Sequence, residues 1–377
     1  MTRPKQDPAV TAEADDRIAR VVANRRDYRD EVTALACQHE NVVLYGCGIM
    51  LASLVPGTWE RYVGRKIDFC CDSDPYKWGQ TFAGLPCISP EELQAIGDRS
   101  TVFVTIGQFK PVFDSLSRGA IASVNLIYKY DLSSAEFLAT HDDDEIVAGL
   151  VAARRLLADE RSLRVFDAIM ARGFGASVDP CIMMDVCEPD QYFPADVVTL
   201  TDHESFVDAG AFDGDTVTDF VERTEGRFAR VTCFELDRAN HRALAETVRR
   251  LPCADRIVIH NLGVWDGASE IAYSADSLQS TVGEGDAKGC VVALDDALGS
   301  EPVTYIKMDI EGAEMRGLRG AEGIIRAQKP RLAVCAYHHI RDLWELPLAI
   351  HELVPEYRIY LRHHTNLEYE TVCYAVA

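Results

Sequence analysis

Short apolar runs alternate with amphipathic stretches along most of this chain, and the alternation restricts the fold more than any other feature. In the second half, such runs lie at residues 205–211, 230–236, 256–264, 303–310, 331–337, 357–363 and 370–376. Strands that alternate with helices form parallel sheets covered on both faces. The six residues between the last two runs (364–369) are too few for a parallel crossover, which needs about a dozen. The sequence therefore predicts an α/β fold whose carboxy-terminal sheet ends in an antiparallel strand.

The same alternation occurs earlier in the chain and indicates a second, smaller domain. VVLYG (42–46), KIDFCCD (66–72) and TVFVTIG (101–107) are predicted strands, and one leading helix is expected between about residues 11 and 38. The acids Asp142 to Glu145 precede a helical stretch and are suited to cap its N-terminus, with a metal site as the alternative. At 377 residues the chain has room for two or three domains. We predict a helical segment at 1–40, a Rossmann-like domain at 41–130, a helical connector at 131–195 and a second domain at 196–377.

Charge and hydropathy exclude several classes of partner. Sixty Asp and Glu residues against 38 Lys and Arg give a net charge of −22, which repels nucleic acids and anionic membranes. The longest uncharged apolar run, residues 42–55, would span about 21 Å as a helix, less than the roughly 30 Å of a bilayer core. The first residues show no secretory pattern. We expect a cytoplasmic protein without a membrane span.

The 12 cysteines do not show metal-binding spacing. Most lie in apolar strand-like runs, and none form a C-x-x-C pair. We interpret them as small core residues in a reducing compartment and expect no metal.

Acidic residues and glycines follow the predicted strands of the second half. In FVDAGAFDGDTV, Asp208 ends a strand, and Gly210 and Gly214 form a turn before a helix whose N-terminus offers free N–H groups. This D-x-G-x-x-x-G spacing departs from the G-x-G-x-x-G of nicotinamide sites, and a carboxylate there suits an amino group better than a pyrophosphate. Glu235 ends the next strand, where it could accept hydrogen bonds from both ribose hydroxyls of an adenosine, and Asp237 is a weaker candidate. Together these motifs predict an S-adenosylmethionine site.

Further polar residues follow the fourth and fifth strands of this half. Lys307, Asp309 and Glu311 share one side of the fourth strand, at the sheet edge where ligands bind, and the lysine could keep the acids ionised. The alternative is a strand-to-helix turn with solvated charges. Histidine suits a general base near neutral pH, and His338 is favoured for this role, with a structural histidine as the alternative.

On these motifs, residues 192–377 resemble the FkbM family of S-adenosylmethionine-dependent O-methyltransferases. The matching segments include QYFPADVVTL, FVDAGAFDGDT, CFELD, HNLGVWDG, IKMDIEGAEMRGLRGAE and YHHIRDLWELP. The resemblance implies a class I methyltransferase sheet with an antiparallel last strand, preceded by a smaller Rossmann-like domain. It also implies that Asp208, Gly210, Gly214 and Glu235 bind the cofactor, with Asp309 and Glu311 beside the transferring methyl. Taking the motifs and the resemblance together, we predict two sets of site residues: for the cofactor Asp208, Gly210, Ala211, Asp213, Gly214, Glu235, Asn261 and Asp309, and for catalysis Lys307, Asp309, Glu311 and His338. Asp213 stands where many members have Asn.

The expected reaction is methylation of a hydroxyl on a sugar, a glycan precursor or a related natural product, by a chain that could form homo-oligomers. Two alternatives stay open: a nucleotide-sugar-binding protein without catalytic activity, and an NAD-dependent oxidoreductase or epimerase. The turn Gly46-Cys47-Gly48 and the acid Asp72 at the end of the following strand are the features that favour nucleotide binding by the amino-terminal domain. The other role for that domain is docking or positioning of the substrate.

Overall fold

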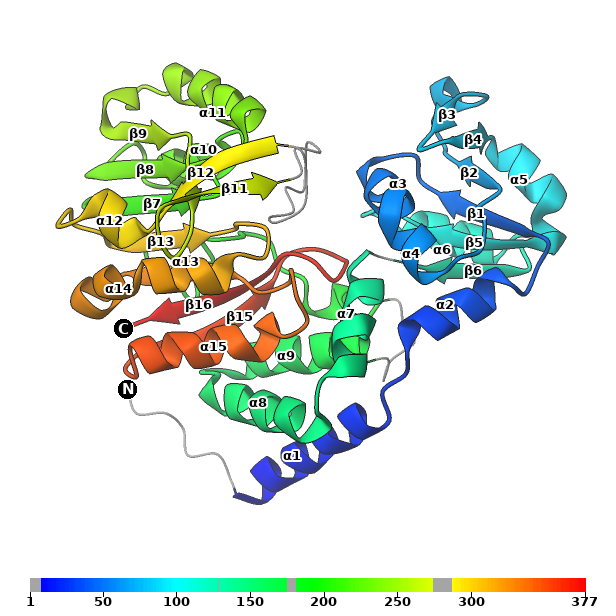
Figure 1. Cartoon of the computed structure of the whole chain (residues 1–377), viewed down its shortest axis with the longest axis horizontal. Helices are drawn as coiled ribbons and strands as arrows, with labels where there is room; N and C mark the ends of the chain where they lie inside the picture. The colour runs from blue at the N-terminus through cyan, green and yellow to red at the C-terminus, as the bar shows by residue number, and fades with distance from the viewer. Residues whose placement is uncertain (1–7, 128, 175–180, 274–286) are drawn as a thin grey trace.

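The computed structural model describes residues 8–127, 129–174, 181–273 and 287–377, and these residues form two α/β domains joined by helices (Figure 1). The first helices of the described residues are α1 (Pro8–Ala23) and α2 (Tyr28–Ala36), so the single leading helix expected from the sequence is two helices. The break falls at Asp27, whose side chain accepts a hydrogen bond from the N–H of Arg29 and caps α2. Buried residues of α1 pack with the carboxy-terminal domain, whereas those of α2 pack with the amino-terminal domain.

The amino-terminal domain contains a six-stranded sheet in the order β3-β4-β2-β1-β5-β6, in which only β3 is antiparallel to its neighbour. Its strands are β1 (Asn41–Tyr45), β2 (Phe69–Cys71), β3 (Thr81–Phe82), β4 (Leu85–Ile88), β5 (Ser100–Val104) and β6 (Ser123–Leu126). Its helices are α3 (Ile49–Leu54), which continues through a π-turn (Val55–Trp59) into α4 (Glu60–Tyr62), then α5 (Pro90–Ile96) and α6 (Lys110–Ser117). Alternate residues of β1 are buried on opposite faces, which confirms the predicted smaller Rossmann-like domain.

The connecting segment is helical, with α7 (Lys129–Thr140), α8 (Asp143–Leu156) and α9 (Glu160–Gly173). Asp142 accepts hydrogen bonds from the N–H groups of Asp144 and Glu145, which confirms that the acids before α8 cap the helix. Leu150 of α8 and Phe166 of α9 share a core with the carboxy-terminal sheet. Much of the connector is therefore part of that domain's core.

The carboxy-terminal sheet has seven strands in the order β15-β16-β14-β13-β7-β8-β9. They are β7 (Ser205–Ala209), β8 (Arg230–Phe234), β9 (Ile257–His260), β13 (Tyr305–Met308), β14 (Arg331–Cys335), β15 (Arg358–His363) and β16 (Thr371–Val376). The last strand, β16, lies between β14 and β15 and is antiparallel to both. This arrangement confirms the predicted hairpin and the class I methyltransferase topology.

Helices cover both faces of this sheet (Figure 1). Phe206 packs with α10 (Asp215–Arg223) and α11 (Arg238–Arg250), whereas its neighbour Val207 faces the core that contains α8, α9 and α13 to α15. A small sheet, β10-β12-β11, lies beside the main one. The remaining elements are β10 (Gly263–Val264), β11 (Ser269–Tyr273), β12 (Ala287–Val292), α12 (Leu294–Leu298), α13 (Glu314–Gly320), α14 (Glu322–Gln328) and α15 (Asp342–Leu353).

The turn between β15 and β16 contacts the amino-terminal domain. Leu367 is buried in the core that contains Phe109, and the Asn366 side chain donates a hydrogen bond to Gln108 over 3.2 Å. Because Gln108 and Phe109 follow β5, the carboxyl edge of the smaller sheet faces the larger domain. No helix in the described part of the chain combines the length and apolar character that crossing a membrane requires.

Candidate active site

A cavity of about 410 Å³ lies at the carboxyl ends of β7, β8, β13 and β14. Most of its lining comes from the carboxy-terminal domain, but the first turns of α3 in the amino-terminal domain close one side. The site residues predicted from the sequence that line it are Gly210, Glu235, Lys307, Asp309 and Glu311. The residues contributed by α3 are Ile49, Met50 and Ser53. The cavity is therefore an interdomain site at the edge where open α/β sheets bind ligands.

Asp208 and Lys307 form a buried ion pair beneath this cavity. They are directly opposite each other on β7 and β13, and Lys307 Nζ lies 3.0 Å from Asp208 Oδ1. Lys307 also donates a hydrogen bond to the carbonyl oxygen of Gly210 over 2.6 Å. Burial raises the pKa of Asp208 to about 6 despite the opposing charge of Lys307. Asp208 does not line the cavity, so it can act on a ligand only through Lys307 and the turn after β7.

The turns that surround the cavity have unusual backbone conformations. Gly210 has a φ of 80°, and a Cβ at this position would lie 1.8 Å from the carbonyl oxygen of Asp309. Four non-glycine residues of the lining have left-handed φ values between 47° and 68°: Tyr192, Phe212, Glu311 and Glu370. Such conformations are costly, and they cluster at functional sites where the surrounding structure enforces them.

Glu235 is held at the end of β8 by backbone N–H groups. Its Oε2 accepts a hydrogen bond from Phe212 (2.9 Å), and its Oε1 accepts one from Asp237 (2.8 Å). Burial raises the pKa of Glu235 to about 7, although these two hydrogen bonds favour the ionised form. Each carboxylate oxygen keeps acceptor capacity toward the cavity.

Asp309 is the best-supported carboxylate of the site. The hydroxyls of Tyr192 and Tyr337 donate to its Oδ2 (2.8 Å) and Oδ1 (3.2 Å). Burial opposes its charge, but Lys307, His338 and the Tyr192 hydroxyl outweigh burial and lower the pKa of Asp309. Asp309 is therefore a carboxylate at neutral pH.

His338 lies behind these acids and does not itself line the cavity. Its Nε2 is 3.5 Å from Glu311 Oε2 and 3.7 Å from Asp309 Oδ1, and its Nδ1 is 3.1 Å from Glu314 Oε1. Burial raises the pKa of Glu311, and His338 opposes this shift. The histidine and the two cavity-facing acids thus form one connected group.

Comparison with known proteins agrees with this geometry. Residues 208–367 match the family model described as the methyltransferase FkbM domain. The carboxy-terminal domain belongs to the FkbM methyltransferase family. The protein is therefore a methyltransferase that depends on S-adenosylmethionine. The negatively charged cavity and the acceptor set of Glu235 fit this positively charged adenosine derivative.

Solved structures extend the likeness of the fold to both domains. The FkbM methyltransferase from Methylobacillus flagellatus KT matches 98% of this chain and 100% of its own, with 24% identity and a TM-score of 0.76. SMU.1697c from Streptococcus mutans, solved in complex with SAH, matches 48% of this chain and 92% of its own, with 11% identity and a TM-score of 0.30. No curated protein matches the sequence significantly.

The predicted residues that do not line the cavity surround it in supporting positions of the FkbM domain. Asn261 donates to the carbonyl oxygens of Glu235 (2.9 Å) and Leu236 (3.0 Å), and so holds the end of β8. Gly214, with a φ of 90°, precedes α10 and packs against α11. Ala211 is buried, and Asp213 accepts a hydrogen bond from the N–H of Asp215.

Sequence reasoning missed several polar residues that line the FkbM site, including the acid Asp215. Tyr192, Tyr337 and Glu370 all line the cavity, and the Gln191 side chain donates a hydrogen bond to Glu370. Burial raises the pKa of Glu370 to about 7, and the charge of Asp309 adds to the shift. All three lie within segments that resemble the family, so the segments pointed to them although no single motif did.

Proposed function

We propose that the FkbM domain methylates a hydroxyl group of a sugar, a glycan precursor or a related natural product. The observation that carries this proposal is the group formed by Asp309, Glu311 and His338 at one cavity. Transfer to oxygen requires removal of the hydroxyl proton, and carboxylates beside a histidine are suited to accept it.

The cofactor site of this proposal lies on the β7–β8 side of the cavity. When bound, S-adenosylmethionine supplies an electrophilic methyl group on a sulfonium. Glu235 would accept hydrogen bonds from the ribose hydroxyls, and the turn around Gly210 would face the methionine part. Asp208 would act as a positioning residue, because it pairs with Lys307 beneath this turn.

We assign the general base to Glu311 together with His338. Glu311 faces the cavity, and its raised pKa makes it a stronger base than an ordinary glutamate. His338, at 3.5 Å, stabilises the charge of Glu311 and is positioned to share the proton. Asp309 is fixed by two tyrosines and is suited to orient the acceptor hydroxyl by accepting a hydrogen bond.

The charge of the lining favours an acceptor without phosphate near the reacting hydroxyl. Among the described residues, the cavity is lined by one ammonium group, that of Lys307, and by five carboxylates: Asp215, Glu235, Asp309, Glu311 and Glu370. Like charges repel strongly in a partly desolvated site. Neutral polyols can instead donate hydrogen bonds to these oxygens.

For the amino-terminal domain we propose a role in positioning the acceptor. Ile49, Met50 and Ser53 of α3 close the cavity opposite the FkbM domain. Asp72, the acid that a nucleotide would need, instead accepts hydrogen bonds from Cys47, Asp74 and Lys77 of its own domain. The domain limits at residues 40, 130 and 195, the cytoplasmic location and the homo-oligomer stay predictions.

The test is methyl transfer from labelled S-adenosylmethionine to a panel of neutral sugars, phosphorylated sugars and polyketide-type alcohols. We expect neutral polyols to be methylated, and Glu311→Gln and His338→Ala to slow turnover by about 10²–10⁴-fold. Cofactor affinity, measured by calorimetry, should stay unchanged in both variants. The control is His203→Ala, because the side chain of His203 is 89% exposed. Unaltered turnover in both variants would show that Glu311 and His338 are not the general base. A preference for phosphorylated sugars would contradict the proposal that the acceptor is a neutral polyol.

A further inference from the structure

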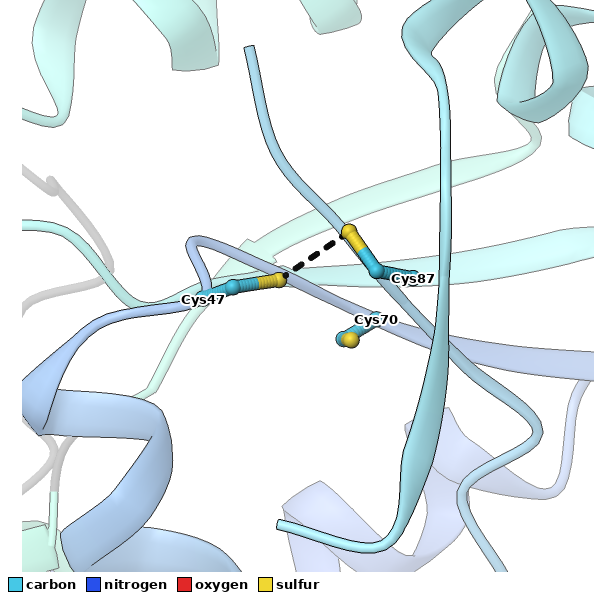
Figure 2. A group of neighbouring side chains, drawn as sticks. All are labelled: Cys47, Cys70 and Cys87. Carbon is cyan, nitrogen blue, oxygen red and sulfur yellow. Dashed lines mark hydrogen bonds between the residues drawn. The ribbon is translucent and has the colours of Figure 1, made fainter. Parts of the chain in front are cut away.

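Three cysteines that are distant in sequence meet in the amino-terminal domain, outside the methyl-transfer cavity. Cys47 follows β1, Cys70 lies in β2, and Cys87 lies in β4. Their sulfur atoms all lie within 4.8 Å of one another, and those of Cys47 and Cys87 are 3.5 Å apart. Figure 2 shows the sulfur atoms of Cys47 and Cys87 facing each other, with Cys70 beside them. These residues lack the close spacing in sequence by which metal sites are predicted, so the expectation of no metal did not take them into account.

The backbone fixes this arrangement. Cys70 and Cys87 are directly paired on parallel strands, so their side chains leave the sheet on the same face. The turn at Gly46 then places Cys47 over that face. Cys47 is held on both sides, since its N–H donates to Asp72 (2.8 Å) and its carbonyl accepts from Lys77 (3.2 Å).

We propose that Cys47, Cys70 and Cys87 form a three-sulfur binding site for a soft metal ion, and that this ion is Cu(I). Thiolates favour soft ions such as Cu(I) and zinc. A structural zinc site needs four ligands, and no imidazole or carboxylate in the described residues joins this group. Three sulfurs at about 2.3 Å from a common ion would lie roughly 4 Å apart, which is within the 4.8 Å limit of the group and close to the 3.5 Å between Cys47 and Cys87.

The competing explanation is that the cysteines are only core residues. Cysteine is often buried, and all three lie in one apolar cluster. Cys71 is the internal comparison, because it follows Cys70 but points to the opposite core. It belongs to none of the cysteine groups found in the described residues. Packing in an apolar core is enough to explain why Cys71 is buried. It does not explain why the sulfur atoms of Cys47, Cys70 and Cys87 lie within 4.8 Å of one another.

Binding at this site needs no oxidant or reductant. The ion enters as Cu(I), each thiol that binds it loses its proton to solvent, and no electron is transferred. Because Cys47 lies two residues before Ile49 of α3, an ion here would fix the start of the helix that closes the methyl-transfer cavity.

The experiment is an anaerobic titration of the full-length protein with Cu(I) against a coloured Cu(I) chelator. We expect one tightly bound equivalent, at least 10²-fold weaker binding in Cys70→Ser and in Cys87→Ala, and no change in the exposed controls Cys37→Ser and Cys290→Ser. Zinc, titrated in the same way, should bind more weakly than Cu(I). Glu235→Gln should retain the copper, which separates this proposal from the methyl-transfer proposal.

X-ray absorption on the wild-type protein gives a second readout that depends on no variant. We expect only sulfur neighbours at about 2.3 Å from the copper. Nitrogen or oxygen ligands, tighter zinc binding, or equal copper binding by wild type and Cys70→Ser would each overturn the assignment. Circular dichroism of each variant establishes that lost binding does not reflect lost fold.

Discussion

The two large sheets of this protein have the same kinds of residue at their carboxyl edges, a glycine turn and an acid, but the two acids have different partners. Each has a glycine turn after its first strand and an acid at the end of its second, Asp72 in one domain and Glu235 in the other. Asp72 pairs with Lys77 at 2.8 Å, within its own loops. Glu235 receives only backbone N–H groups in the described contacts, because the nearby Lys307 pairs with Asp208 instead. Asp72 is therefore bound to residues of its own domain, whereas Glu235 faces the cavity.

The pKa directions of the two acids reflect this difference. Burial opposes the charge of Asp72, but Lys77 and two backbone N–H groups outweigh burial and lower its pKa. For Glu235, burial dominates and raises the pKa to about 7. In this protein, the acid at the second strand end faces a ligand cavity where the nearby lysine has another partner, and is closed off where that lysine pairs with it.

The largest effect is expected from breaking the buried ion pair of the FkbM domain. Asp208→Ala leaves the ammonium of Lys307 buried without its partner and should lower the free energy of unfolding by about 3–5 kcal/mol. Asp72→Ala should cost only about 1–2 kcal/mol, because Asp72 and Lys77 are partly exposed. Urea unfolding of both variants measures the difference. Equal losses would mean that the two edges are energetically alike.

The affinity for S-adenosylmethionine should depend on Glu235 at the edge of the larger sheet and not on Asp72 at the edge of the smaller one. Glu235→Ala should weaken S-adenosylmethionine binding by about 10²-fold, because the hydrogen bonds expected between its carboxylate and the ribose are lost. Asp72→Ala is the matched control and should leave the affinity unchanged. Calorimetry of both variants decides, and an unchanged affinity in Glu235→Ala would move the ribose site elsewhere.

The pH dependence sharpens this test. Since the ionised form accepts both ribose hydroxyls, and the pKa of Glu235 is about 7, affinity should be full above pH 7. Below that pH it should fall by up to tenfold per pH unit as the carboxyl becomes protonated. Glu235→Gln should bind weakly with a flatter profile. An unchanged slope in this variant would assign the titration to another group, such as Glu370.

Strand-end motifs identified Glu235, Asp309 and Glu311, because parallel strands bring their carboxyl ends to one edge regardless of packing details. The role of Asp208 as the partner of Lys307 depends on strand register, which spacing alone does not give. Tyr192 reaches Asp309 from 117 positions away, so only the tertiary structure could reveal the contact.

The arrangement of the two domains was predicted less completely, because it also depends on tertiary contacts. The alternation of strands and helices gave both sheets and the final hairpin. It missed the short strands β3, β4, β6, β11 and β12, and it merged β9 and β10 into one predicted strand at 256–264, because two to six residues carry little periodicity. The approach of α3 to the FkbM cavity depends on contacts such as that of Leu367 with the core around Phe109. No local pattern encodes such contacts.

The smallest expected effect concerns that interdomain wall. Met50→Ala removes apolar surface from the side of the cavity contributed by α3 and should raise the KM for the acceptor several-fold, which corresponds to about 1 kcal/mol. The affinity for S-adenosylmethionine should not change, since its predicted contacts lie on the β7–β8 side. Ala52→Ser is the matched control, because Ala52 is exposed on the same helix and does not line the cavity. Weakened cofactor binding with an unchanged KM for the acceptor would instead place α3 beside the cofactor, and the two sheet edges would then share one ligand.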